Sequence, residues 1–258
     1  MSLIAFKLLL PPILILLASL AGRRWGDAIG GWLVGLPLTS GPVAAFLALQ
    51  HGPQFAAMAT NGSLVGTAAQ ACFCMGYALL AERGWQIAMA GGILAFGAAA
   101  GLLQIAQLSH LLLFLLALAA LILGAQIIPH RQALRSSVAA PWWDLPARMV
   151  VATTLVVTLT AAAAFVGAQV AGVLAAFPIF AATLAIFAHR MKGPAMAMQV
   201  LRGMVFALFG FAVFFYVLGP MLTGIGLIPA FLAATLCSLL VQGLSLRLVR
   251  RQAGPIME

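Results

Sequence analysis

The stretch that decides the architecture is "GLPLTSGP", residues 35–42, which lies in the middle of a long apolar segment. Pro37 and Pro42 each lack a backbone N–H, so a helix entering from about Gly26 is predicted to stop near Leu36 and restart near Pro42. A hydroxyl followed by a proline in the first turn is typical of such a restart. Interrupted backbone inside a bilayer is tolerated only where it is buried in protein or lines a wet cavity.

The composition around this stretch excludes a soluble protein. The chain has 258 residues, of which 64% are hydrophobic and 7% charged, and its mean hydropathy is +1.15. Soluble domains carry about 25% charged residues. The formal net charge of +9 does not indicate nucleic-acid binding, because the basic residues lie in short gaps between apolar runs. We therefore expect one membrane domain that spans the whole chain.

Nine apolar runs are long enough to cross a bilayer, which takes about 20 residues. They cover residues 3–21, 27–50, 53–81, 84–105, 107–128, 147–168, 170–189, 194–218 and 221–246. With the N-terminus outside, the cytoplasmic gaps hold most of the basic residues, as the positive-inside rule requires. These are Arg23, Arg24, Arg83, Arg131, Arg135, Arg148, Arg190, Lys192, Arg247, Arg250 and Arg251. The expected location is the cell membrane, in a bacterium the inner membrane, with the C-terminus in the cytoplasm.

An internal repeat becomes visible when the chain is shifted by 141 residues against itself. Pro37 then falls on Pro178, and Gly52-Pro53 falls on Gly193-Pro194. Spans one to four correspond to spans six to nine, and the single span between them turns the second copy upside down. The expected organisation is a first repeat over residues 1–105, a linker helix over 106–129, a cytoplasmic loop over 130–146 and a second repeat over 147–250.

The predicted fold class is an all-α polytopic membrane protein with about nine transmembrane helices. It has two inverted-topology four-helix repeats, joined by a linker helix, with broken helices at Pro37 and Pro178. This plan resembles the broad architecture of many secondary transporters and of some channels, in which the site lies near the midplane where the copies meet. The resemblance implies a site at the broken helices and no particular substrate.

The candidate site begins at the restarted half-helix. Its first N–H groups and partial positive charge suit an anion or a carbonyl oxygen, and Thr39, Ser40 and Gly41 lie at its start. The alternative is a packed kink in which the two hydroxyls satisfy the freed backbone themselves. In the second copy apolar residues replace the hydroxyl pair, so that stretch is expected to bend rather than bind, with Thr183 as its nearby polar group.

Arg202 and its repeat counterpart Asn61 complete the candidate site. Arg202 lies eight residues after Pro194, about 12 Å into the membrane, whereas all four acidic residues fall in the predicted cytoplasmic belt. An arginine at that depth without a carboxylate marks a functional site, and the substrate is then a candidate for its counter-ion. The alternatives are that Arg202 snorkels to the cytoplasmic surface and that Asn61 only joins helices.

The remaining reactive residues give no catalytic or metal-binding pattern. The three cysteines lie inside apolar runs without metal-ligand spacing and are expected to be core residues. His51, His110, His130 and His189 lie at span ends, which predicts that no histidine relay is buried. We expect no cofactor and no enzyme activity, because paired acids and histidine-rich helix motifs are missing from the sequence.

These features together predict a secondary transporter for a small anionic or carboxylate-bearing solute, working by alternating access. The alternatives on the same scaffold are a channel or facilitator, and a flippase for anionic lipids. The coupling ion stays open, because the chain has no acidic residue within the membrane. The expected partners are membrane lipid and a small-molecule or ion substrate, without nucleic acid. Assembly as a homo-oligomer or within a larger complex also stays open.

Overall fold

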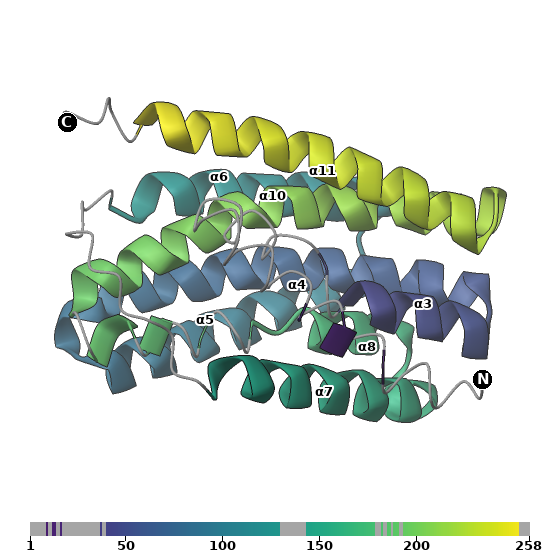
Figure 1. Ribbon diagram of the computed structural model, residues 1–258, viewed down its shortest axis with the longest axis horizontal. Coiled ribbons are helices and arrows are strands. Elements are labelled where there is room, and N and C mark those ends of the chain that lie inside the picture. Colours follow the sequence, from purple (N-terminus) through teal and green to yellow (C-terminus); the bar gives the residue numbers. More distant parts are fainter. Residues whose placement is uncertain are drawn as a thin grey trace.

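The computed structural model describes residues 37, 40–129, 143–178 and 193–252, together with residues 9, 12, 13, 16, 182, 185, 186 and 188–190. Every element within these parts of the chain is a helix (Figure 1). In chain order they are α3 (Ser40–His51), α4 (Pro53–Leu80), the short 3₁₀ helix η1 (Ala81–Arg83), α5 (Trp85–Ile105), α6 (His110–Ile127), α7 (Asp144–Val166), α8 (Ala168–Ala175), α10 (Pro194–Gly224) and α11 (Leu227–Gln252).

Five segments in the described chain are long and apolar enough to cross a membrane. They are Pro53–Arg83, Trp85–Ile105, His110–Ile127, Pro194–Gly224 and Leu227–Leu244. They coincide with five of the nine predicted spans, and the described chain is accordingly an all-α membrane protein. The predicted span 3–21 and the first half of the predicted span 27–50 fall largely outside the described residues, and α3 forms the second half of the latter. The predicted span 147–168 overlaps α7, and the predicted span 170–189 is interrupted after α8.

The helices that follow the two Gly-Pro pairs begin in the same way. Gly52 has a φ of 90° and Gly193 a φ of 81°, a region that glycine enters without steric cost. Pro53 and Pro194 are the first residues of α4 and α10. Proline is tolerated there, because an N–H group in the first turn of a helix has no intrahelical acceptor. At both turns the glycine N–H donates to the carbonyl four residues earlier, and the glycine carbonyl accepts from the residue four later.

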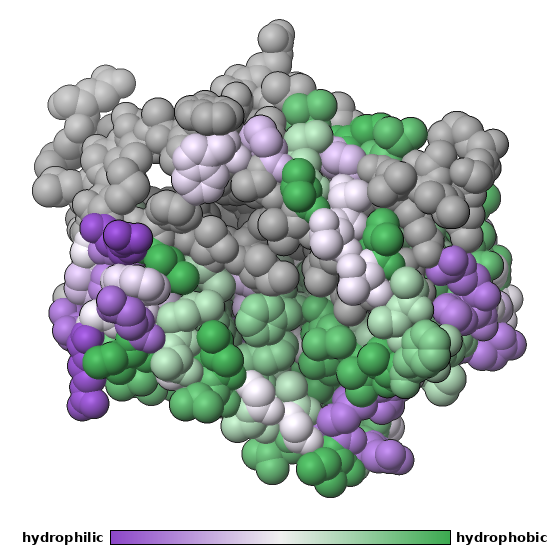
Figure 2. Space-filling view, turned by 90° about the horizontal axis from the view of Figure 1, so that it is seen from below, coloured by the Kyte–Doolittle hydropathy of each residue, from purple (hydrophilic) through white to green (hydrophobic). Residues whose placement is uncertain are grey.

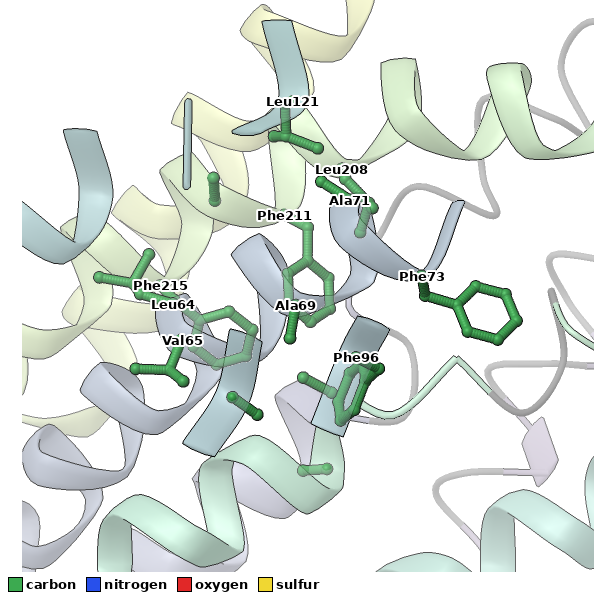
Figure 3. Close-up of a cluster of buried hydrophobic side chains, with 14 of the residues drawn as sticks. Leu64, Val65, Ala69, Ala71, Phe73, Phe96, Leu121, Leu208, Phe211 and Phe215 are labelled. Carbon is green, nitrogen blue, oxygen red and sulfur yellow. The ribbon is translucent and has the colours of Figure 1, made fainter. Parts of the chain in front are cut away.

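α4 lies at the centre of the bundle and packs against α3, α5, α6, α8 and α10 (Figure 1). Its sequence suits this place, because Ala, Gly, Ser and Thr make up most of residues 56–71. Larger side chains reach this core from the neighbours, among them Phe96 of α5, Leu121 of α6 and Phe211 of α10 (Figure 3). Small residues on a central helix allow close packing, which is what holds helices together in lipid.

α10 runs antiparallel to α4, whereas α6 runs parallel to it. Thr60, near the start of α4, faces Gly219 near the end of α10. Cys74, late in α4, contacts Met204 early in α10, with 3.8 Å between the two sulfur atoms. The first residue of α6 contacts the beginning of α4, and its last turn contacts the later half of α4.

The outer faces of the bundle carry large apolar side chains. On α11 four leucines at four-residue intervals, Leu232, Leu236, Leu240 and Leu244, are each more than half exposed. This spacing keeps them on one face of the helix. Figure 2 shows hydrophobic residues over much of the middle of the described surface, with hydrophilic residues gathered towards its two sides. Such a surface is suited to contact with lipid tails.

α8 crosses α4 at the level of the backbone. A Cβ atom added to Gly62 of α4 would overlap the carbonyl oxygen of Gln169, and one added to Gly172 of α8 would overlap the carbonyl oxygen of Ala59. The two glycines therefore form a reciprocal contact that holds α8 against α4. Small residues at such crossings are the usual means of close helix approach in membranes.

One predicted boundary is wrong, because α10 continues past residue 218 and includes Pro220. A proline inside a helix leaves the carbonyl four residues earlier without a donor. Here that carbonyl belongs to Tyr216, and the His110 ring donates to it from Nε2 at 2.9 Å. Because a side chain replaces the missing donor, the helix runs on to Gly224, and the turn to α11 comes at Gly226, where φ is 86°.

Candidate functional site

The chain leaves helical conformation at Pro178, where the sequence predicts a break. α8 ends at Ala175, and residues 176–178 lie outside any helix. Helical residues follow from Ala182, whose N–H donates to the Pro178 carbonyl at 2.8 Å. Pro178 has no N–H to continue the helix, which accounts for the end of α8 just before it.

The described part of α3 begins at Ser40, and the preceding residues 38 and 39 lie outside the described residues. Pro37 is not helical, and its carbonyl accepts a hydrogen bond from the Gly41 N–H at 2.7 Å. This bond has the same form as the one between Ala182 and Pro178. Two predicted site residues, Thr39 and Thr183, lie outside the described residues.

Ser40 is the most informative residue at the start of α3. It is 2% exposed, and its Oγ atom has no hydrogen-bond partner among the described residues. Gly41 is also buried, and a Cβ atom there would lie 3.8 Å from the Pro37 ring and 3.9 Å from Phe214. Burying a hydroxyl without a partner is unfavourable. Together with the positive end of a helix, it makes this position suited to a polar ligand atom.

Ser40 and Pro178 both lie well away from the ends of their predicted spans. α3 has 12 residues, so Ser40 lies about 18 Å along the helix from the Gly52 turn. Phe177, beside Pro178, packs edge-on against Phe96 with 5.0 Å between ring centroids, and Phe96 is near the midpoint of the 21-residue α5. α8 also contacts both α3 and α4. In a hydrocarbon core about 30 Å thick, these positions correspond to the central region.

Asn61 belongs to a junction of three helices. Its Oδ1 atom lies 2.6 Å from Nδ1 of His110, which is the first residue of α6. The other ring nitrogen of His110 contacts the Tyr216 carbonyl of α10, and the His110 ring stacks on the Tyr216 ring at 5.2 Å. The Asn61 side chain is thus engaged between helices, which agrees with the alternative that it joins them.

Arg202 lies at the other end of α6. Its Nη1 atom donates to the carbonyls of Ala125 and Ile128, both at 2.6 Å, and its guanidinium lies 5.3 Å from the Phe206 ring centroid. The last carbonyls of a helix lack intrahelical donors, and the C-terminus carries a partial negative charge. Arg202 therefore caps α6 with a charge-assisted interaction, a role that neither sequence hypothesis for this residue included.

The structure does not bring Asn61 and Arg202 together. They contact opposite ends of α6, which has 18 residues and is therefore about 27 Å long. A small solute cannot touch both side chains at once in this arrangement. Ser40 and Gly41, by contrast, are adjacent at the start of α3, where both are buried.

Two of the histidines at predicted span ends are at least partly buried. His189 is only 9% exposed, and its Nδ1 atom lies 3.1 Å from the hydroxyl of Tyr77, which is fully buried on α4. His110 is partly buried at the three-helix junction. Both histidines lie at the ends of predicted spans, as expected, but neighbouring helices cover those ends. A possible signal for His110 is Pro220, since it leaves the Tyr216 carbonyl in need of a donor.

Among the described residues, no three His, Cys, Asp or Glu side chains form a group that could hold a metal ion. Compared with protein-family models, with curated proteins and with solved structures, the chain gives no significant match. The site must therefore be interpreted from its own chemistry.

Proposed function

We propose that the protein is a secondary transporter that moves a small anionic or carboxylate-bearing solute across the cytoplasmic membrane by alternating access. The observation that carries this proposal is the buried Ser40 hydroxyl in the first described turn of α3, which has no hydrogen-bond partner among the described residues. Transporters place their sites at helices interrupted near the midplane, where half-helix ends face the solute. The end of α8 at Pro178 supplies a second interruption at a similar depth.

The proposal includes nine spans in two inverted repeats. Its support is the pair of matched hydrogen bonds, from Gly41 to Pro37 and from Ala182 to Pro178, together with the matched turns at Gly52 and Gly193. The equivalent helices α4 and α10 are antiparallel. An axis that relates two antiparallel spanning helices lies in the membrane plane, as inverted repeats require. The charge pattern places the N-terminus outside and the C-terminus in the cytoplasm.

The proposed solute site is the start of α3, with Thr39, Ser40 and Gly41, and Thr183 from the second copy. The positive end of α3 and the Ser40 hydroxyl favour an oxyanion, such as a carboxylate, over a cation. We place Asn61 and Arg202 outside direct contact with the solute, because each is bonded at one end of α6. Their part is then to hold the linker helix against the two copies.

The test is uptake of radiolabelled small carboxylates and inorganic anions into proteoliposomes. We expect saturable uptake of at least one anion, with efficiency lowered about tenfold or more in Ser40→Ala, since a hydrogen bond to a charged group contributes about 1.5–3 kcal/mol. The matched control is Ser63→Ala, because the buried Ser63 hydroxyl donates to the Ala59 carbonyl of its own helix. Equal loss in both variants, or unchanged uptake in Ser40→Ala, would contradict the site. Flux that does not saturate would favour a channel.

A further inference from the structure

His110 joins three helices and is not part of the proposed solute site. It is the first residue of α6, and its ring reaches Asn61 on α4 and the Tyr216 carbonyl on α10. The Tyr216 ring stacks on the His110 ring at 5.2 Å and on the Phe114 ring at 4.1 Å. The imidazole is therefore fixed in place by neighbours on both sides of the junction.

The acceptor on α10 exists because of Pro220. This proline has no N–H for the Tyr216 carbonyl four residues before it, so the carbonyl depends on a donor from elsewhere. Gly219 gives the ring access, since a Cβ atom there would lie 2.9 Å from Cε1 of His110 and 2.5 Å from Oγ1 of Thr60. Proline and glycine thus form a notch in α10 that the histidine fills.

Both ring nitrogens of His110 face oxygen atoms. Nδ1 lies 2.6 Å from Asn61 Oδ1, and Nε2 lies 2.9 Å from the Tyr216 carbonyl oxygen. A carbonyl oxygen only accepts hydrogen bonds, and a neutral imidazole has a single N–H. Both bonds can form together only when both nitrogens carry hydrogen. After loss of one proton, the Asn61 amide must turn over to donate, or its contact with the ring is lost.

Few charged or titratable groups face the ring. α6 carries none besides His110 itself, and α10 contributes the Tyr216 phenol, with Arg202 at the far end of α6. On α4 the nearest titratable residue in sequence is Cys72, about 16 Å further along the helix. Within the described parts of these helices, the two oxygen acceptors are therefore the main polar groups that interact with the His110 ring.

We propose that His110 is a proton-binding site whose charged form clamps α4, α6 and α10 together, and whose neutral form weakens the contact with α4. Histidine is the side chain suited to such exchange near neutral pH, and hydrogen bonds from a charged donor are the stronger ones. This inference deepens the proposed transport function, and its role in coupling rests on that function. It names the proton as the coupled ion in a chain whose acidic residues all fall in the predicted cytoplasmic belt.

The first test needs no solute. Ring ¹⁵N NMR of histidine-labelled protein in nanodiscs, assigned with His110→Gln and recorded over a pH series, should show His110 losing one of two ring protons as the pH rises. The difference in thermal midpoint between wild type and His110→Gln should be about 2–4 °C larger at the acid end of this series than at the alkaline end. The exposed His51 provides the control, because the thermal midpoint of His51→Gln should depend on pH in the same way as that of wild type.

Pro220→Ala tests the same clamp without touching the histidine, because alanine restores an N–H for the Tyr216 carbonyl and should reduce the pH effect. A His110 signal that stays neutral over this pH range, or a pH effect that persists in His110→Gln, would overturn the proton site. In proteoliposomes, a pH gradient should drive uptake in wild type but not in His110→Gln, while solute exchange continues. If Ser40→Ala loses both pH-driven uptake and solute exchange, the result concerns the solute site and not the proton site. The two proposals can therefore fail separately.

Discussion

Asn61 and Arg202, which are 141 positions apart in the sequence, hold opposite ends of helix α6. In the proposed repeat they are equivalent positions on α4 and α10. The linker helix has a polarity, so the two ends need different partners. Its last carbonyls take a cationic donor from Arg202, whereas its first residue, His110, places a ring nitrogen against the Asn61 oxygen. The difference between the copies at this position thus follows from the direction of α6.

The first prediction concerns the cap on α6. Arg202→Met should lower the free energy of unfolding by about 2–3 kcal/mol, since hydrogen bonds with a charged donor contribute about 1.5–3 kcal/mol. Arg202→Lys should be intermediate, because an ammonium keeps the charge but not the planar fork. Thermal unfolding in detergent measures both. If Arg202→Met keeps the stability of wild type and loses only stabilisation by added anions, Arg202 is a solute ligand after all.

The second prediction compares two glycines at equivalent positions. Gly62→Ala places a methyl group against the Gln169 carbonyl and should destabilise the fold by about 1–3 kcal/mol, the usual effect of overpacking. Gly203 is exposed and has nothing within 4 Å of an added Cβ atom. Gly203→Ala should therefore stabilise the protein by up to about 1 kcal/mol through helix propensity. Destabilisation of the same size in both variants would count against the α4–α8 crossing.

The third prediction tests the inverted topology directly. In a chain with Cys72, Cys74 and Cys237 replaced by alanine, single cysteines are introduced at Gln54 and at Ala195, its equivalent in the second copy. A membrane-impermeant maleimide on intact cells should label the cysteine at Gln54. The one at Ala195 should react only after the membrane is opened. An exposed cysteine at Gln86 provides a cytoplasmic control. Labelling of both test positions from the same side would exclude inverted repeats.

The fourth prediction concerns the buried pair of Tyr77 and His189. Tyr77→Phe keeps the ring but removes the hydroxyl that lies 3.1 Å from His189 Nδ1. We expect a loss of about 1 kcal/mol, the typical contribution of a neutral hydrogen bond. Tyr216→Phe is the matched control, because its ring stacks on His110 while its hydroxyl has no hydrogen bond in the described chain. Unchanged stability in Tyr77→Phe, or a loss no larger than in Tyr216→Phe, would show that the hydroxyl contact with His189 does not stabilise the fold.

Several features of the fold could be read from local sequence. Five spans are long apolar runs, and the Gly-Pro pairs mark the turns before α4 and α10, because glycine permits a positive φ and proline suits the first turn of a helix. The end of α8 just before Pro178 follows from the missing N–H of proline, whereas the chain before Pro37 lies outside the described residues. Such effects act over a few residues and need no knowledge of neighbouring helices.

The chain by itself determined which segments are apolar and where the Gly-Pro turns and the end of α8 fall, since these depend on hydropathy and on backbone chemistry. Only the tertiary structure decided what the polar residues do. Arg202 meets the carbonyls of α6, and His110 meets a carbonyl that Pro220 deprives of its donor, because hydrogen-bond partners come from helices distant in sequence. In a membrane interior without water, a buried polar group takes the partner that packing provides.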